Sequence, residues 1–463
     1  MATVRSSLKQ LLPDLVEVVG PDHVLSDPDL KAPYESDWTG RWHGNANVVI
    51  RPGTTSQVSA VMGILSNARV AVVPQGGNTG LVGGGVPRGG EAVISLRRLD
   101  HLGPVDKASA QVNAGAGVTL ARLQAHARAA GLLFGVDLAA RDSATIGGMV
   151  ATNAGGIHVL RYGMMRAQVV GAELVMADGS VVRRMSGLKE NTGYDLVGLA
   201  TGSEGTLAIV TEARLRLVAE PGERVVAMCG VADLEAAIAL TAALRNIASL
   251  EALEVLDSQA MAIVRGHTGL PSVVAGDWEW YVLMECAGDG DLVAALHGAI
   301  TSVEGVSEPA VALEPARRAD LWSYRERLTE SISALGIPHK LDVAIPLKEL
   351  GLFAKDLREH LHALSPQARP VLFGHLAEGN LHVNILGLSP SDSSADEMVL
   401  HLAADHGGTI SSEHGVGIAK QPWLALTRSQ EDRSVMRAIK QALDPDGLLN
   451  PGVLFGLEPY HKT

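Results

Sequence analysis

The segment FGHLAEGNLHVNI (373–385) places two histidines at a spacing that could form one metal site. A four-residue turn at 377–380 would bring His375 opposite His382 across a hairpin, where facing Cβ atoms lie about 4.5–5.5 Å apart. Two imidazoles at that separation can ligate one ion. Asn384 would project from the same strand face as His382. A single histidine is more often structural, but this pairing favours a metal-binding hairpin.

Glu413 and His414 lie together in a glycine-flanked segment, ISSEHGVGIAK (410–420). One carboxylate added to two imidazoles gives a three-ligand, partly open site of the kind that zinc enzymes use in catalysis. His414 could then act as a general base rather than as a ligand. The alternative is a solvent-exposed Glu-His pair with no chemical role.

A group of cationic and hydroxyl side chains could bind a carboxylate. Arg325 and Thr329 are four residues apart, so they would share one face of a helix expected at 317–330. Lys340 begins a strand expected at 339–346. Arginines on a helix are usually solvent-exposed, but in a chain of net charge −13 their convergence on one pocket would suit an anionic substrate.

Three glycine-dense stretches suggest a site for a long, flat ligand. The loop VPQGGNTGLVGGGVP (73–87) follows an apolar strand, and its backbone N–H groups could bind phosphate oxygens. It contains neither G-x-G-x-x-G nor G-x-x-x-x-G-K-[ST], so it is neither a Rossmann fingerprint nor a P-loop. Similar stretches lie at 142–163 and 201–211. Ordinary glycine turns are the alternative.

These stretches, with ADGSVV, NTGYDL and LDPDGLLNPGVLFG, resemble the FAD-binding domain of the vanillyl-alcohol-oxidase/p-cresol-methylhydroxylase superfamily. The resemblance implies that the 76–81 loop binds the FAD pyrophosphate and that 142–156 and Asn450 approach the isoalloxazine. It implies non-covalent FAD, because the 73–87 loop has neither histidine nor cysteine. The implied cofactor-binding residues are Pro74, Gly76, Gly77, Asn78, Thr79, Gly80, Leu81, Asp137, Ser143, Ile146, Gly147, Gly148, Ala151, Asn153, Gly155, Gly156, Glu204, Ile209 and Asn450.

The later motifs resemble, in order and spacing, the family of D-2-hydroxyglutarate dehydrogenases, and DWTGRWHGNANVVIRPGTT (37–55) fits as well. This resemblance implies zinc or another divalent metal on His375, His382 and Glu413, with His414 as the catalytic base. It implies oxidation of a D-2-hydroxy dicarboxylic acid, D-2-hydroxyglutarate or the shorter D-malate, to the 2-oxo acid. The implied substrate-binding residues are Arg325, Thr329, Lys340, Asn384 and His414.

Three other functions remain open at this stage. D-lactate dehydrogenases and glycolate-oxidase flavoprotein subunits share the histidine hairpin and the Glu-His pair. A zinc hydrolase would purify colourless. A non-catalytic flavin-binding subunit would carry FAD that no hydroxy acid reduces.

The elements that must position these residues alternate between strands and helices. The dipeptide Asp178-Gly179 indicates a hairpin, and Pro221-Gly222 indicates a domain boundary. Strands are expected at 48–52, 70–74, 92–96 and 206–217, and helices at 118–130, 232–247, 395–406 and 430–443.

We therefore expect an α+β protein in three parts. A two-subdomain FAD-binding domain of the p-cresol-methylhydroxylase type, with a helical N-terminal arm, would occupy 1–219. A mixed α/β substrate domain would occupy 220–390, and a small helical C-terminal part at 391–463 would return to the FAD.

The composition agrees with a large folded enzyme. Hydrophobic residues make up 46% of the 463 residues and charged residues 19%, which excludes extended disorder. The acidic net charge provides no basic field for nucleic acid. Cys229 and Cys286 are expected to be core thiols in a cytoplasmic protein, and no apolar run is long enough to span a membrane. A homodimer is the expected assembly, with an electron-transfer flavoprotein or a quinone-linked carrier as the electron acceptor.

Overall fold

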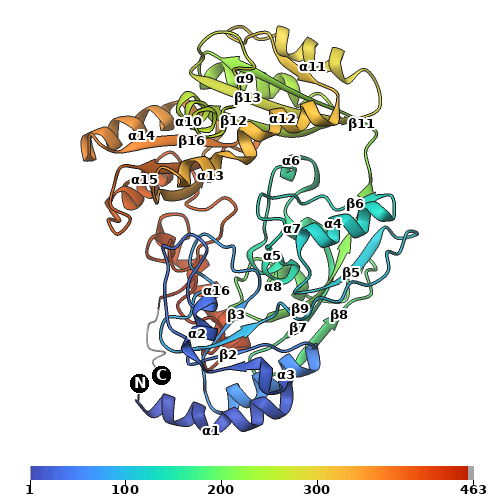
Figure 1. Cartoon of the computed structure of the whole chain (residues 1–463), viewed down its shortest axis with the longest axis vertical. Coiled ribbons are helices and arrows are strands. Elements are labelled where there is room, and N and C mark those ends of the chain that lie inside the picture. Colours follow the sequence, from blue (N-terminus) through green and yellow to red (C-terminus); the bar gives the residue numbers. More distant parts are fainter. Residues whose placement is uncertain (1, 457–463) are drawn as a thin grey trace. The chain divides into compact units, whose positions relative to one another are not determined.

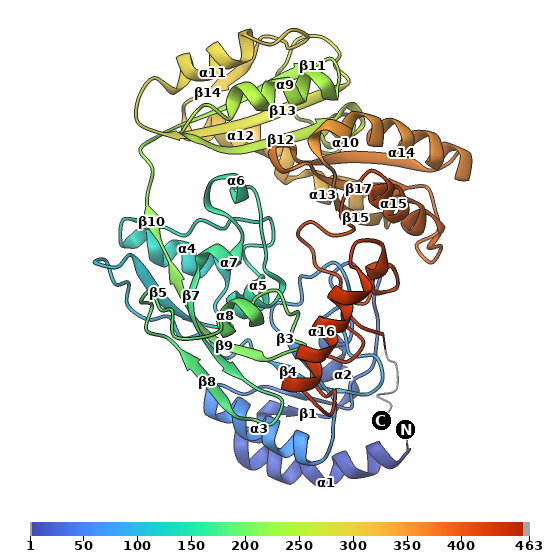
Figure 2. The ribbon, with the colours of Figure 1, turned by 180° about the vertical axis from the view of Figure 1, so that it is seen from behind.

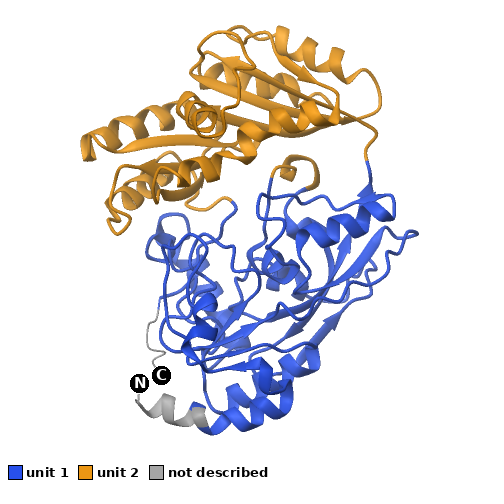
Figure 3. Ribbon diagram, viewed as in Figure 1, with its two compact units in different colours: residues 1–156, 163–220, 413–463 blue, residues 157–162, 221–412 orange. Residues whose placement is uncertain are grey.

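The computed structural model describes residues 2–456, which fold into two compact units (Figure 3). The units are discontinuous along the chain. Unit 1 contains residues 1–156, 163–220 and 413–463, and unit 2 contains Ile157–Tyr162 and Pro221–Ser412. Within the described residues, no helix combines the length and apolar composition that crossing a membrane requires.

The first sheet of unit 1 has four short strands in the order β1-β2-β4-β3. β2 and β3 are parallel to β4, whereas β1 is antiparallel to β2. Helices α1 and α3 lie side by side (Figures 1 and 2), and their apolar side chains share one core with β2. These elements are β1 (Val24–Leu25), β2 (Val48–Ile50), β3 (Val72–Gln75), β4 (Ala92–Ser95), α1 (Ala2–Val19), α2 (Pro28–Lys31) and α3 (Thr55–Asn67).

The second sheet of unit 1 is antiparallel, in the order β5-β9-β7-β8. Asp178-Gly179 forms the turn between β7 and β8, and Gly179 has a φ of +86° that favours glycine. The strands are β5 (Gln111–Gly115), β7 (Val169–Val175), β8 (Val181–Arg184) and β9 (Ile209–Arg216). A separate pair joins β6 (Leu132–Leu133) to β10 (Val218–Ala219).

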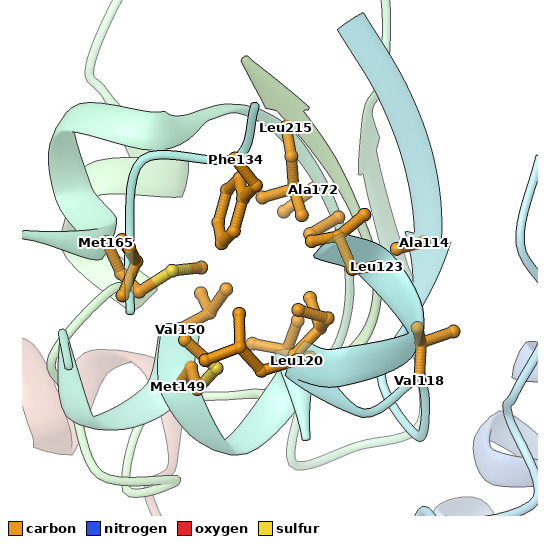
Figure 4. Close-up of a cluster of buried hydrophobic side chains, with 14 of the residues drawn as sticks. Ala114, Val118, Leu120, Leu123, Phe134, Met149, Val150, Met165, Ala172 and Leu215 are labelled. Carbon is orange, nitrogen blue, oxygen red and sulfur yellow. The ribbon is translucent and has the colours of Figure 1, made fainter. Parts of the chain in front are cut away.

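Helices cover this sheet and enclose a hydrophobic core. Figure 4 shows side chains from the strands, the helices and the segment after β6, among them Leu123, Phe134, Val150, Met165 and Leu215, pointing toward one another. Thr119 caps α4 by accepting a hydrogen bond from the Arg122 amide. The helices are α4 (Leu120–Ala129), α5 (Ile146–Thr152), α7 (Met165–Gln168) and α8 (Leu196–Ala200).

The C-terminal segment completes unit 1. Helix α16 (Gln430–Leu443) begins with a capping box at Ser429, and the chain then pairs with β3. The Val72 amide donates to the Leu448 carbonyl and the Asn450 amide donates to the Val72 carbonyl, both at 2.8 Å. Lys440 Nζ donates to the Thr206 and Leu449 carbonyls at 2.7 and 2.8 Å.

Unit 2 is built on a seven-stranded antiparallel sheet in the order β14-β11-β13-β12-β16-β17-β15. The predicted core thiols Cys229 and Cys286 are buried and free in this sheet. The strands are β11 (Glu223–Val231), β12 (Leu250–Asp257), β13 (Trp280–Gly288), β14 (Ala310–Ala312), β15 (His339–Ala344), β16 (Arg369–His375) and β17 (Asn380–Leu386).

Helices α10, α12 and α13 pack on one face of this sheet and form a core with β12 and β16. Figures 1 and 2 show α9 and α11 on the other face. The remaining helices, α14 and α15, contact each other. The helices are α6 (Val159–Tyr162), α9 (Leu234–Leu244), α10 (Ser258–Thr268), α11 (Leu292–Thr301), α12 (Pro315–Glu326), α13 (Leu328–Ser333), α14 (Leu350–Leu364) and α15 (Ser394–Asp405).

Most expected elements are present, and one helix differs. The strands, the hairpin and the helices listed from the sequence all form, with ends shifted by a few residues. The single helix expected at 317–330 is wrong, because the chain turns at Arg327 and separates α12 from α13. The three-part division at 219/220 and 390/391 rests on sequence breaks and stays a prediction.

Candidate active site

The histidine hairpin forms, but with a different register from the one expected. Strand β16 pairs Phe373, not His375, with His382. The turn starts one residue earlier than expected, as a 3₁₀ turn ending at Gly379, where φ is +68° and a Cβ would lie 2.0 Å from the Ile345 carbonyl oxygen. His375 and His382 are therefore diagonal neighbours on one sheet face, with ring centroids 5.4 Å apart, which keeps both imidazoles at one place.

The neighbouring strand β15 adds two charged residues to the same face. Asp342 pairs with His382, and Lys340 pairs with Asn384. The fully buried Asp342 carboxylate lies 3.4 Å from His382 Nδ1 and accepts a hydrogen bond of 3.1 Å from the Ser412 amide. Ser412 is the last residue of unit 2, and Glu413 and His414, which follow it directly, are described with unit 1.

On the other side of the hairpin, strand β12 contributes Glu254. This residue is fully buried and pairs with His375 in the sheet. Its carboxylate accepts a hydrogen bond from His375 Nδ1 and another, of 2.5 Å, from Arg325 Nε. Burial would raise the pKa of the Glu254 carboxyl, but the charges of His375 and Arg325 lower this pKa to about 2.

Phe373 is the apolar centre of this group. The Arg325 guanidinium lies 4.6 Å from the Phe373 ring centroid, and the His382 ring centroid lies 5.1 Å from it. The sheet and α12 thus bring Arg325 and His382 against one ring, and His375 lies next to His382. Thr329, half-buried in α13, completes the set of predicted substrate residues in unit 2.

The donor set in unit 2 fits a metal ion. Metal-binding histidines usually hold a carboxylate or carbonyl on their second ring nitrogen, which leaves the other nitrogen to face the ion. Glu254 is bonded to His375 Nδ1, and Asp342 lies next to His382 Nδ1. Nε2 of each ring is then the nitrogen that would bind a divalent ion. Glu254, Asp342 and Phe373 were not predicted from the sequence, although each of the two acidic residues stands between apolar neighbours in its strand.

In unit 1, the predicted flavin loops pack against each other through glycines. A Cβ at Gly77 would lie 2.0 Å from the Ser143 carbonyl oxygen, and a Cβ at Gly76 would lie 2.3 Å from Thr145 Oγ1. At Gly156 it would lie 1.9 Å from the Asp137 carbonyl oxygen. The loop after β3 can therefore approach the loop before α5 only without side chains, which fits a site that cradles a pyrophosphate by its backbone.

Four predicted cofactor residues have left-handed backbone conformations, an arrangement that clusters at functional sites. Their φ values are +56° at Asn78, +50° at Asn153, +53° at Glu204 and +44° at Asn450. Of the other predicted positions, Pro74 lies in β3, and Ile209 begins β9. Those in the loops and in α5 are Thr79, Gly80, Leu81, Ile146, Gly147, Gly148, Ala151 and Gly155.

Glu204 connects the flavin loops to the Glu-His segment within unit 1. Its buried carboxylate accepts hydrogen bonds from the Val416 amide at 2.9 Å and the Gly417 amide at 2.8 Å, and burial raises its pKa. Asn450 Nδ2 donates to the Glu204 carbonyl at 2.7 Å. Glu413 accepts a 3.3 Å hydrogen bond from the Gly156 amide. The segment that carries the predicted base is thus fixed to the predicted flavin loops.

Comparison with known proteins agrees with both units. Residues 46–184 match the family model of an FAD binding domain, and residues 220–454 match that of FAD linked oxidases, C-terminal domain. A D-2-hydroxyglutarate dehydrogenase of Xanthomonas citri pv. viticola is 38% identical over 97% of this chain and 96% of its own. A mitochondrial D-2-hydroxyglutarate dehydrogenase of Bos taurus is 35% identical over 94% of this chain and 82% of its own.

The fold is also that of a solved structure. The structure of p-cresol methylhydroxylase with substrate bound matches with a TM-score of 0.80 and 18% identity, covering 98% of each chain. The fold and the matched domains define an FAD-dependent dehydrogenase with the p-cresol-methylhydroxylase architecture. The chain belongs to the FAD-linked oxidase family, in the same group as the D-2-hydroxyglutarate dehydrogenases, which confirms the resemblance inferred from its motifs.

Proposed function

We propose that this dehydrogenase oxidises D-2-hydroxyglutarate to the corresponding 2-oxo acid. The observation that carries the proposal is the position of Arg325, which is 9% exposed and lies on the sheet face that holds His375 and His382. A buried guanidinium next to two histidines that could bind a metal suits a substrate with one carboxylate at the reacting end and a second carboxylate farther away. The names of the relatives support the same substrate.

In the proposed reaction, Arg325, Lys340 and the Thr329 hydroxyl bind the distal carboxylate, and Asn384 contacts the reacting end. His414 accepts the proton of the C2 hydroxyl. FAD would take up the hydrogen and electrons from C2, and a divalent ion held by His375, His382 and Glu413 would favour the deprotonated hydroxyl. The same proposal includes zinc as the metal and D-malate as a shorter substrate. It also includes a homodimer in the cytoplasm, and reoxidation of the flavin by an electron-transfer flavoprotein or a quinone-linked carrier.

Substrate choice tests the proposal directly. The oxidised protein is mixed anaerobically with D- and L-2-hydroxy acids, and flavin bleaching is followed. D-2-hydroxyglutarate should react far faster than D-lactate, because D-lactate lacks the carboxylate that would pair with the buried cations. The ratio should approach the 10⁴–10⁵-fold discrimination that enzymes reach against a substrate lacking the group their buried polar residues bind. L-enantiomers should fail, because the inverted C2 turns its hydrogen away from the flavin. Equal reduction by D-lactate would instead favour the D-lactate or glycolate alternative.

Removal of the distal cations should abolish this preference. We expect Arg325→Ala to lower kcat/KM for the diacid by an amount that corresponds to several kcal/mol of lost transition-state stabilisation. Turnover of D-lactate should change little. Lys340→Met gives an independent variant in case Arg325→Ala destabilises the fold. Arg317→Ala, at a side chain that is 79% exposed on the same helix, is the matched control. A similar loss for both acids would refute the distal-carboxylate role.

Metal removal tests the other half of the site. Chelation, or His382→Ala, should abolish turnover but leave FAD bound, because the predicted FAD-binding residues are all in unit 1. Added zinc should restore the chelated wild type and not the variant. His401→Ala removes an exposed histidine of α15 and serves as the control. Full activity of rigorously metal-free protein would contradict the metal assignment.

A further inference from the structure

Glu254 is a buried carboxylate shared between two groups with different proposed tasks. One oxygen accepts from Nδ1 of His375, a proposed metal ligand, and the other accepts from Nε of Arg325, a proposed substrate ligand. The two partners come from separate elements, β16 and α12. No sequence motif connects them, since Glu254 is 121 residues from His375 and 71 from Arg325.

The geometry of this carboxylate restricts both partners. A hydrogen bond to Nδ1 fixes the tautomer and the plane of the His375 ring, so that Nε2 is the atom that would face an ion. Because Nε of Arg325 donates to Glu254, the end of the guanidinium that carries Nη1 and Nη2 is the part left for a ligand. That edge matches the two oxygens of a carboxylate. Phe373 supports the arrangement, because the guanidinium stacks on its ring at 4.6 Å.

The second histidine is held differently. The Asp342 carboxylate lies 3.4 Å from His382 Nδ1, and its other oxygen accepts from the Ser412 backbone. Glu254, through its hydrogen bonds with His375 and Arg325, joins the two halves of the proposed site.

We infer that Glu254 is a positioning residue that orients His375 for the metal and Arg325 for the distal carboxylate, so that one buried carboxylate sets both metal affinity and dicarboxylate preference. The inference rests on the proposed function. It differs from a purely structural role, in which Glu254 only neutralises a buried arginine and its loss lowers stability alone.

The test compares Glu254→Gln with a matched variant in the full-length, FAD-loaded protein. Glutamine retains the size of the side chain and one acceptor oxygen, but its amide cannot accept from the second partner. The control is Glu285→Gln on β13, which also removes a buried carboxylate bonded to an arginine, Arg224, and to Trp322 Nε1. These partners of Glu285, Arg224 and Trp322, are neither proposed metal ligands nor proposed substrate ligands.

Three quantities are measured: zinc affinity of metal-free protein by chelator competition, the ratio of kcat/KM for D-2-hydroxyglutarate over D-lactate, and the unfolding midpoint. In Glu254→Gln, zinc affinity should fall by about 10–100-fold, as for other partners of metal ligands, with a parallel loss of the substrate ratio and unchanged FAD content. Glu285→Gln should lower only the unfolding midpoint. Glu254→Asp, which retains the charge, should recover part of the zinc affinity.

The outcomes separate this inference from the proposed function. If the wild type prefers the diacid and Glu254→Gln retains both that ratio and its zinc affinity, the positioning role is refuted and the proposed function stands. Loss of only one of the two quantities would refute the coupling. A wild type with no diacid preference would refute the proposed function, and with it the substrate half of this inference.

Discussion

In unit 1 the predicted flavin-binding positions are fixed by backbone conformation and glycine contacts, whereas in unit 2 the predicted metal and substrate residues are fixed by buried charges. Gly76, Gly77 and Gly156 each meet a neighbouring loop where no side chain fits. By contrast, His375 and Arg325 are oriented by one carboxylate, Glu254. The predicted flavin site thus depends on local backbone geometry. The predicted substrate site depends on charged pairs whose members are distant in the sequence.

The difference has a physical origin in the two ligands. A pyrophosphate can be bound by N–H groups that every residue carries, so the chain must only remove side chains that would block them. A small hydroxy acid needs charges at defined positions, and buried charges must be paired to be tolerated.

Lys440 is a buried charge in unit 1, so it tests whether this unit depends on backbone contacts alone. It forms an ion pair with Asp444 and donates to the Thr206 and Leu449 carbonyls. Lys440→Met should destabilise unit 1 by about 3–5 kcal/mol, since it leaves a buried carboxylate without its cation. Ser434→Ala, on the exposed side of α16, should stay within about 0.5 kcal/mol. The stability of both variants is measured by urea unfolding, with flavin release as the signal. Equal unfolding midpoints for Lys440→Met and the wild type would refute the role of Lys440.

In unit 2, the buried carboxyl of Asp257 should make the free energy of unfolding depend on pH. Burial raises the pKa of this carboxyl to about 6, although it caps α10 and accepts from the Leu372 amide. The folded state then binds the proton more tightly than the unfolded state. The stabilisation that the protonated Asp257 carboxyl gives the folded state is therefore complete below about pH 4. It is lost as pH rises through 6, which changes the free energy of unfolding by about 3 kcal/mol.

The measurement for Asp257 is the difference in unfolding free energy between wild type and Asp257→Asn, recorded from pH 4 to 7. The asparagine retains an acceptor for the cap but does not titrate, so the difference should change with pH in the stated direction. A constant difference across this range would show that Asp257 titrates normally in the folded protein.

Gly77 tests the backbone half of the comparison. Gly77→Ala places a methyl group against the Ser143 carbonyl oxygen, and strain of about 1–3 kcal/mol should lower FAD affinity by about 10–100-fold. Zinc affinity should not change. Gly63→Ala, in α3 with open space around its Cβ position, should retain FAD and gain up to about 1 kcal/mol of stability. Normal FAD affinity in Gly77→Ala would mean that the two loops separate easily.

Local patterns in the sequence predicted most of the fold. The apolar runs of β2, β3 and β4, the Asp178-Gly179 turn and the cap of α4 each depend on residues close together in the chain. The two histidines of the hairpin were identified by residue type and spacing, but the pairing register of strands β16 and β17 was not predicted. It depends on Gly379, whose turn is fixed by the distant Ile345 carbonyl.

Glu254 and Asp342 were missed for a related reason. Each is an acidic residue between two apolar neighbours in its strand, and its importance comes from a partner on another strand, His375 or His382. A single sequence does not give strand order, so it cannot show which charges will meet. The charge in the middle of EALEVLD was the available signal.

The discontinuity of unit 1 has a consequence for biogenesis. The ribosome releases 221–412, nearly all of unit 2, before the segment that pairs with β3 and supplies Lys440 and Asn450 to unit 1. Domains generally fold as they emerge, at about 5–20 residues per second. Unit 2 can thus fold first, while the N-terminal half of the chain waits for its last strand partner. We therefore expect FAD binding to require this C-terminal segment, so that a chain truncated before residue 440 would bind no FAD.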